Sequence, residues 1–109
     1  MKEIKAVVPQ FMGDKVIDSL REVAHLPGII VSLVNGFSRS DPSAEPAERV
    51  EDAPMIKIEI VVPNEIAETV VETISHAAHT GRPGDGKIFV YEVVEVIEIS
   101  TGERGDAAI

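Results

Sequence analysis

Short stretches of the chain alternate apolar and polar residues with a period of two, which is the pattern of β-strands that bury one face. Met55–Val62 shows it most clearly, because every second residue from Ile56 to Val62 is Ile or Val, whereas Lys57 and Glu59 lie between them. The predicted strands are Lys2–Val8, Ile29–Val34, Met55–Val62 and Ile88–Val94, with Val96–Ile99 as a short extra strand. The pattern therefore predicts a sheet of four main strands.

Two other segments repeat apolar residues every three to four positions, as amphipathic helices do. The first helix is predicted to start after Gly13, with Asp14 as its N-cap, and to stop at Leu26–Gly28. The second is predicted to start with Asn64 as its cap and to be closed by Gly81. On the first helix, helical spacing is followed by Val16, Leu20, Val23 and Ala24, and the predicted buried stripe of the second helix is Ile66, Val70, Ile74, Ala77 and Ala78.

The order of these elements is β-α-β, a long loop, and β-α-β again. This order predicts an α+β, ferredoxin-like βαββαβ fold, in which both helices cover one face of an antiparallel four-stranded sheet. At 109 residues the chain is predicted to form a single domain, residues 1–109. The other face carries residues such as Val7, Val61 and Tyr91. It would be an apolar patch in a monomer, which predicts self-association.

The long loop is predicted to span Ser38–Pro54. It contains three of the seven prolines of the chain and carries five acidic residues against two arginines. A loop of this length inside a compact domain is more often functional or disordered than ordered and inert. The sequence therefore predicts a flexible segment, which acts either as a docking element for a partner protein or as a solvated spacer.

Composition narrows the classes of function. The formal net charge of −9 argues against a nucleic-acid-binding protein, which needs a basic surface to meet phosphates. The absence of cysteine excludes disulfides, thiolate catalysis and cysteine metal ligands. The first apolar run is interrupted by Pro9 and is too short for a signal peptide or a membrane span. We therefore expect a cytoplasmic protein without direct membrane insertion.

The segment TGRPGDGKIFV, Thr80–Val90, joins the second helix to the last strand and carries the candidate chemistry. Gly84 and Gly86 allow backbone conformations in which successive N–H groups converge on an anion, and Lys87 adds a positive charge. A strand follows Lys87, and the spacing of the glycines differs from that of a Walker A loop. The alternative is a purely structural turn in which Asp85 caps its own backbone.

This segment, together with VIEISTGERGDAAI at the C-terminus, resembles the PII family of nitrogen-regulatory signal proteins. KIEIVVP at Lys57–Pro63 and VNGFSR at Val34–Arg39 resemble the same family, and the similarity runs along the whole chain. The resemblance implies a ferredoxin-like homotrimer that binds adenine nucleotides in clefts between subunits. It also implies that the long loop of each subunit docks on a partner protein, such as an enzyme, a transcriptional regulator or a membrane transporter.

The family's nucleotide-binding positions are carried over residue by residue. The implied nucleotide-binding residues are Val7, Gly36, Phe37, Ser38, Arg39, Val61, Arg82, Gly84, Asp85, Gly86 and Lys87. Thr80 and Gly81 match the lead-in to the phosphate-side loop, and Thr101–Glu103 matches the closing motif. No catalytic residue and no metal ligand is implied.

Several positions depart from the family pattern. Glu98 and Ser100 stand where two arginines normally meet the phosphates, and Ser40 stands where a glutamine normally helps bind magnesium and 2-oxoglutarate. The family's early lysine is Pro9, and its adenine-side threonine is Ile30. The loop also lacks the tyrosine that some members have uridylylated. We therefore expect ADP or AMP to be favoured, or ATP to bind weakly, with no response to 2-oxoglutarate.

The main alternative is a metal-handling or metal-sensing trimer of the CutA type, or one associated with an efflux transporter. The pair Asn35–Gly36 resembles a PII branch associated with heavy-metal efflux, and His76 and His79 are spaced to share a metal ion. Those histidines, with His25, equally suit the negative ends of two helices. A small enzyme is a more distant alternative, because the strand carboxylates Glu59 and Glu92 have no nucleophile or histidine beside them in sequence.

Overall fold

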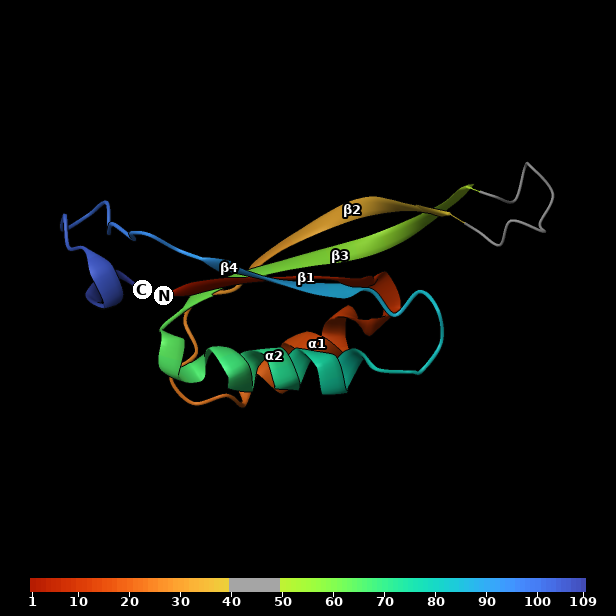
Figure 1. Cartoon of the computed structure of the whole chain (residues 1–109), viewed down its shortest axis with the longest axis horizontal. Helices are drawn as coiled ribbons and strands as arrows, with labels where there is room; N and C mark the ends of the chain where they lie inside the picture. The colour runs from red at the N-terminus through yellow and green to blue at the C-terminus, as the bar shows by residue number, and fades with distance from the viewer. Residues whose placement is uncertain (40–49) are drawn as a thin grey trace.

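The computed structural model describes residues 1–39 and 50–109. The elements are β1 (Lys2–Pro9), the 3-10 turn η1 (Gln10–Met12), α1 (Gly13–Arg21), β2 (Ile30–Arg39), β3 (Val50–Val62), α2 (Asn64–Ala78), β4 (Lys87–Glu92) and the 3-10 turn η3 (Gly105–Ala108). The strands form one antiparallel sheet in the order β2-β3-β1-β4. Helices α1 and α2 pack against each other and cover one face of this sheet (Figure 1). The predicted α+β, ferredoxin-like fold is confirmed.

The core lies between this sheet and the two helices, and strand register explains its composition. Residues directly opposite each other in an antiparallel pair point to the same face. Ile4, Ala6 and Val8 of β1 face Ile60, Ile58 and Ile56 of β3, in that order, and all six are buried. The helices complete the core with Val16 and Leu20 from α1 and Ala67, Val70, Ile74, Ala77 and Ala78 from α2.

No helix among residues 1–39 and 50–109 covers the opposite face of the sheet (Figure 1). Glu3 of β1 lies opposite Val61 of β3 and Tyr91 of β4. Val7 lies four residues further along β1 and therefore on the same face. The prediction that Val7, Val61 and Tyr91 share the uncovered face is therefore confirmed.

This uncovered face is not uniformly apolar. The ammonium of Lys5 lies 5.2 Å from the ring centre of Phe89 and 5.0 Å from that of Tyr91. A neighbouring Lys57–Glu59 pair is separated by 3.5 Å. Contact with the Tyr91 hydroxyl is the main reason that the pKa of Lys5 is raised. Because the charges sit among aromatic rings and partner charges, this face suits contact with a protein surface that also mixes apolar and polar groups.

The segment predicted as a long irregular loop is partly regular. Strands β2 and β3 remain paired well beyond the helices, from Asn35 opposite Pro54 to Arg39 opposite Val50. Residues 40–49 of the predicted loop lie outside the described residues. The low apolar content of this segment misled the prediction, because a two-stranded ladder is held by main-chain hydrogen bonds and does not require buried side chains.

The ends of the helices differ from the sequence prediction. Helix α1 follows η1 directly, so Met12 occupies its N-cap position and Asp14 lies inside the first turn without capping it. Asn64 is the first residue of α2, and its side-chain oxygen accepts a hydrogen bond of 2.9 Å from the N-terminal amine of Met1. Within the described ranges, no helix is long and apolar enough to cross a bilayer.

The C-terminal end of α2 also differs from the prediction. The helix ends at Ala78 because His79 is already extended, with φ −70° and ψ 124°. Gly81 has φ +82° but lies in the connection that follows, so it does not close the helix. The first helix likewise ends earlier than predicted, at Arg21, and Val23 only packs at the margin of the core.

The chain after β4 runs away from the body of the domain (Figure 1). Strand β4 ends at Glu92, two residues before the predicted end. The extra strand predicted at Val96–Ile99 is reduced to a single antiparallel bridge between Ile97 and Arg104. Because this part of the chain forms no ladder with the main sheet, two of its apolar side chains, Val94 and Ile99, are each 97% exposed.

Candidate functional site

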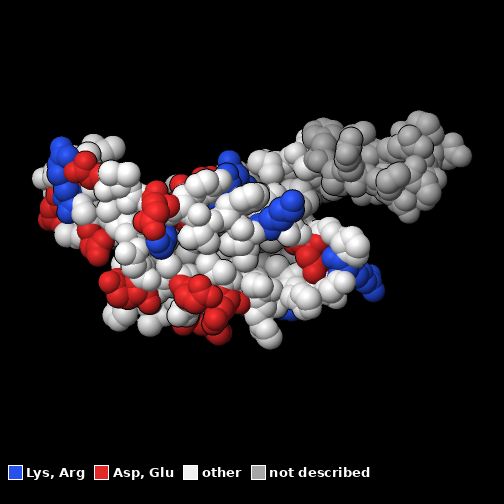
Figure 2. All heavy atoms as spheres, viewed as in Figure 1, with Lys and Arg blue, Asp and Glu red and all other residues white. Residues whose placement is uncertain are grey.

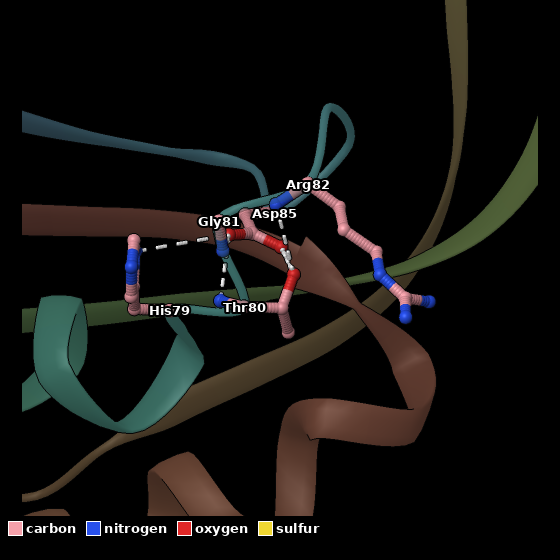
Figure 3. Close-up of polar contacts among 5 residues, drawn as sticks. All are labelled: His79, Thr80, Gly81, Arg82 and Asp85. Atoms are coloured by element: carbon pink, nitrogen blue, oxygen red, sulfur yellow. Dashed lines mark hydrogen bonds and ion pairs between the residues drawn. The ribbon is translucent and has the colours of Figure 1, made fainter.

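The connection between α2 and β4 is organised by one carboxylate. Oδ2 of Asp85 accepts hydrogen bonds from the backbone N–H of Thr80 at 2.8 Å and of Gly81 at 3.0 Å, and Oδ1 accepts the Thr80 hydroxyl (Figure 3). Thr80 Oγ1 in turn accepts the backbone N–H of Arg82 at 3.2 Å. Asp85 therefore caps the backbone of its own turn, as in the purely structural alternative. The amides that converge on it belong to Thr80 and Gly81.

These hydrogen bonds hold the pKa of Asp85 below its ordinary value of 3.8. The largest cause is the Thr80 hydroxyl, followed by the Thr80 backbone N–H. The ionised carboxylate is stabilised by these hydrogen bonds in the folded protein more than in the unfolded chain. The stability that the hydrogen bonds contribute is therefore fully present above pH 3.8. It is lost as the pH falls through the lower value of the folded state.

We therefore expect the connection to loosen reversibly in acid, below pH 3.8. The amide resonances of Thr80 and Gly81, followed by NMR from pH 5 downward, should move together because both N–H groups donate to the same oxygen. An Asp85→Ala variant is the control and should lack this transition. Unchanged Thr80 and Gly81 resonances in the unsubstituted protein would contradict the role assigned to Asp85.

The end of the connection lies against β1. Gly86 has φ +105°, and a Cβ atom placed on it would lie 1.9 Å from the carbonyl oxygen of Val7. No side chain fits there, so the residue must be glycine. Lys87 then opens β4 opposite Val7. The structure thus brings together three of the predicted site residues, Val7, Gly86 and Lys87.

The base of the β2–β3 hairpin approaches the same connection. An open hollow of about 500 Å³ is lined by Pro9, Gln10, Phe11, Ala53, Pro54, Met55 and Gly84. Gly36 lies opposite Ala53 in the ladder, and its backbone packs against Met55. Gly84 and Gly36, which are far apart in the sequence, therefore border one region.

The remaining predicted residues of the hairpin continue along β2. Phe37, Ser38 and Arg39 pair through their backbones with Asp52, Glu51 and Val50. Sequence reasoning did not single out Phe11, which is 80% exposed at the rim of the hollow. The sequence feature that could have identified it is a large apolar residue just after Pro9, outside both the strand and the helix pattern.

Val61 is not brought to the α2–β4 connection within one chain. It pairs with Glu3, whereas Val7 pairs with Lys57, four residues earlier on β3. At about 3.3 Å per residue the two ends of this ladder are roughly 13 Å apart. Arg82 is exposed, and its guanidinium points away from Asp85 (Figure 3). Among the described residues, neither Arg82 nor Lys87 takes part in an ion pair.

The closing motif forms a compact turn that is held by its backbone. The N–H of Glu98 donates to the carbonyl of Glu103 at 2.8 Å, and the N–H of Gly102 donates to the carbonyl of Glu98 at 2.7 Å. The side chain of Glu98 accepts the Ser100 hydroxyl at 3.2 Å. In one chain this turn lies beyond the end of the sheet that is remote from the α2–β4 connection (Figure 1).

The surface around the helices is mainly acidic, and acidic side chains gather over the helical layer in Figure 2. His76 and His79 border one shallow hollow there, together with Glu68 and Glu72 of α2. In the part of the chain that the structure describes, no three His, Asp or Glu side chains are grouped so as to hold a metal ion.

Similarity to known proteins extends along the whole chain. The family model described as nitrogen regulatory protein P-II matches residues 1–103. Nitrogen regulatory protein P-II 1 of Escherichia coli strain K12 is 48% identical over 113 residues, which cover all of both chains.

Two solved structures are similar in both fold and sequence. The first is the GlnK–ATP complex of B. subtilis, with a TM-score of 0.85 and 32% identity, covering 99% of this chain and 94% of that one. The second is Arabidopsis thaliana PII bound to citrate, with a TM-score of 0.81 and 36% identity, covering 99% and 91%. The match of the family model over almost the entire chain, together with these identities, shows that the chain belongs to the nitrogen regulatory protein P-II family.

Proposed function

We propose that this protein is a regulator, not an enzyme, and that it works as a cytoplasmic homotrimer that binds adenine nucleotides in clefts between subunits. The observation that carries the proposal is the convergence of the α2–β4 connection, β1 and the hairpin base around Val7, Gly84, Gly86 and Lys87. The cation of Lys87 and the glycine backbone suit a phosphate group. A similar chain, GlnK of B. subtilis, has been solved as a complex with ATP.

Assembly into a trimer is supported by the exposed apolar surface. Large apolar side chains remain exposed on β2 and β4 and on the chain after β4, and exposed apolar surface that is contiguous marks protein–protein contacts. They include Ile30, Leu33, Phe89, Tyr91, Val94 and Ile99. A cleft between subunits also accounts for the separation of Val61 from Lys87 within one chain, because the two residues would then contact a nucleotide from different subunits.

The proposed preference is for ADP or AMP, with ATP bound weakly and no response to 2-oxoglutarate. In the family pattern two arginines meet the phosphates at the places of Glu98 and Ser100, and here the Glu98 carboxylate is held by the Ser100 hydroxyl. Each lost charge-assisted contact weakens phosphate binding by about 1.5–3 kcal/mol. The number of such contacts rises with the number of phosphates, so the triphosphate loses the most affinity.

The proposed output of the trimer is docking on a partner protein through Ser38–Pro54, where the partner is an enzyme or a membrane transporter. The described part of the β2–β3 ladder, up to Arg39 opposite Val50, extends well away from the helices (Figure 1). Because the hairpin base borders the same hollow as Gly84, a ligand bound there is positioned to influence how the hairpin is held.

Calorimetry with ATP, ADP, AMP and 2-oxoglutarate tests this proposal. We expect ADP or AMP to bind more tightly than ATP, and 2-oxoglutarate to change none of the three affinities. A Lys87→Gln variant should bind about tenfold more weakly or worse, because one charge-assisted contact is removed. Lys15→Gln, which removes an exposed lysine of α1, is the matched control and should bind normally.

Two results would contradict the proposal. The first is tight, magnesium-dependent ATP binding that 2-oxoglutarate strengthens, which would reject the proposed ligand preference. The second is a single subunit in analytical ultracentrifugation, which would remove the clefts between subunits altogether.

A further inference from the structure

His79 occupies an unusual position between helix α2 and the α2–β4 connection. It is the first residue after the helix, and its extended backbone directs the chain into Thr80 and Gly81. Its imidazole lies beside Gly81, since a Cβ placed on Gly81 would be 3.8 Å from His79 Nε2. On the other side, Nδ1 of His79 lies 4.0 Å from Oδ2 of Asp85 (Figure 3).

The oxygen that faces His79 is the one that organises the connection. Oδ2 of Asp85 accepts the backbone N–H groups of both Thr80 and Gly81. A proton on the imidazole would therefore place a positive charge beside the acceptor that holds these amides. It would also offset the negative charge that Asp85 presents near Gly86 and Lys87, where the proposed phosphate site lies.

Other charged groups also lie around His79. Asp85 and Lys87 border one hollow of about 260 Å³ with His79. Glu68, Glu72 and His76 border a second hollow on the helix side. Among the described residues, the Asp85 carboxylate is the group recorded as an ion-pair partner of His79, with Nδ1 and Oδ2 4.0 Å apart.

We propose that His79 is a positioning residue of the α2–β4 connection and that its protonation strengthens anion binding. The positive imidazole would attract the Asp85 carboxylate, hold it in place and reduce the local negative charge. This inference rests on the proposed nucleotide site. A histidine side chain usually gains its proton between about pH 6 and 7, within the range in which cells vary. Nucleotide binding should therefore strengthen as the pH falls through this range.

The expected effect is modest, because the His79 side chain is 73% exposed. An exposed ion pair of this kind changes an affinity by up to about fivefold. The test is titration with ADP at pH 5.5 and at pH 8.0. The terminal phosphate of ADP also titrates near about pH 6, so ADP itself contributes to the pH dependence of binding. This contribution is the same for the wild-type protein and for His79→Gln, and comparing the two removes it.

We expect the ratio of the two affinities to be about two- to fivefold larger for the wild-type protein than for His79→Gln. His25→Asn is the matched control and should retain the wild-type ratio. His25 lies beyond α1 against a different hollow, and asparagine tolerates its left-handed backbone with φ +61°. Equal ratios for the wild type and His79→Gln would overturn the inference.

A second measurement separates this inference from the proposed function. In the protein without ligand, the amide resonances of Thr80 and Gly81 should shift between pH 8.0 and 5.5, and the shift should vanish in His79→Gln. If ADP binds at neither pH but the amides respond in this way, the nucleotide site is wrong and the coupling of His79 to Asp85 stands. Amides that do not respond in the wild-type protein would overturn the coupling.

Discussion

Replacing Gly86 with alanine is expected to destabilise the protein by about 3 kcal/mol or more. Two physical causes add. The backbone at Gly86 has φ +105°, which a residue with a side chain rarely adopts. In addition, the new Cβ would lie 1.9 Å from the carbonyl oxygen of Val7, so the backbone of β1 or of the connection must move. Urea denaturation monitored by circular dichroism measures the change.

Gly84→Ala is the matched control for this prediction. Gly84 has a similar φ of +98°, but the space around it is open, so the substitution adds strain without a clash. We expect a cost of about 1–2 kcal/mol, clearly below that at Gly86. Equal costs at the two positions would mean that the close approach to Val7 is relieved by a small backbone shift and does not hold the connection against β1.

Converting Glu98 and Ser100 to arginine together is expected to raise the affinity for ATP at least about tenfold. The double substitution replaces an anion and a hydroxyl with two cations at the positions where the family pattern has arginines. The turn itself should persist, because the backbone hydrogen bonds between Glu98 and Glu103 and between Gly102 and Glu98 do not involve these side chains. Calorimetry with ATP and with AMP measures the change.

The comparison between the two nucleotides makes this prediction specific. AMP should gain less than ATP, since it offers fewer phosphate oxygens to the new cations. A Glu95→Arg variant controls for the general rise in positive charge, because Glu95 precedes the turn and pairs with Arg104. If that control gains as much ATP affinity as the double variant, the effect is a long-range one and Glu98 and Ser100 do not face the phosphates.

The fold was predictable because its apolar pattern is regular. Ile56, Ile58 and Ile60 alternate with Lys57 and Glu59, and this alternation alone identifies a strand with one buried face. The prediction was less accurate at the ends of elements, as at the start of α1 and the end of α2. Helix ends depend on which nearby groups accept or donate hydrogen bonds, and these groups come from neighbouring segments that local sequence does not reveal.

The candidate site was predictable mainly as a set of residue types. Glycines with lysine in GDGK predicted a special backbone and a positive charge, and resemblance to a family assigned them to a phosphate. Neither approach revealed Phe11, which borders the same hollow as Gly84. Its position beside this hollow depends on the distance between the turn after β1 and the base of the β2–β3 hairpin, two segments that are far apart in the sequence.

The sequence by itself determined the βαββαβ order, the buried alternation on β1 and β3, and the family to which the chain belongs, because these depend on local periodicity and on motifs. Only the tertiary structure decided that Asp85 binds the Thr80 and Gly81 amides, that Gly86 touches Val7, and that His79 faces Asp85. The physical reason is that such contacts depend on strand register and on side-chain directions within a connection. Both are set by packing of the whole domain.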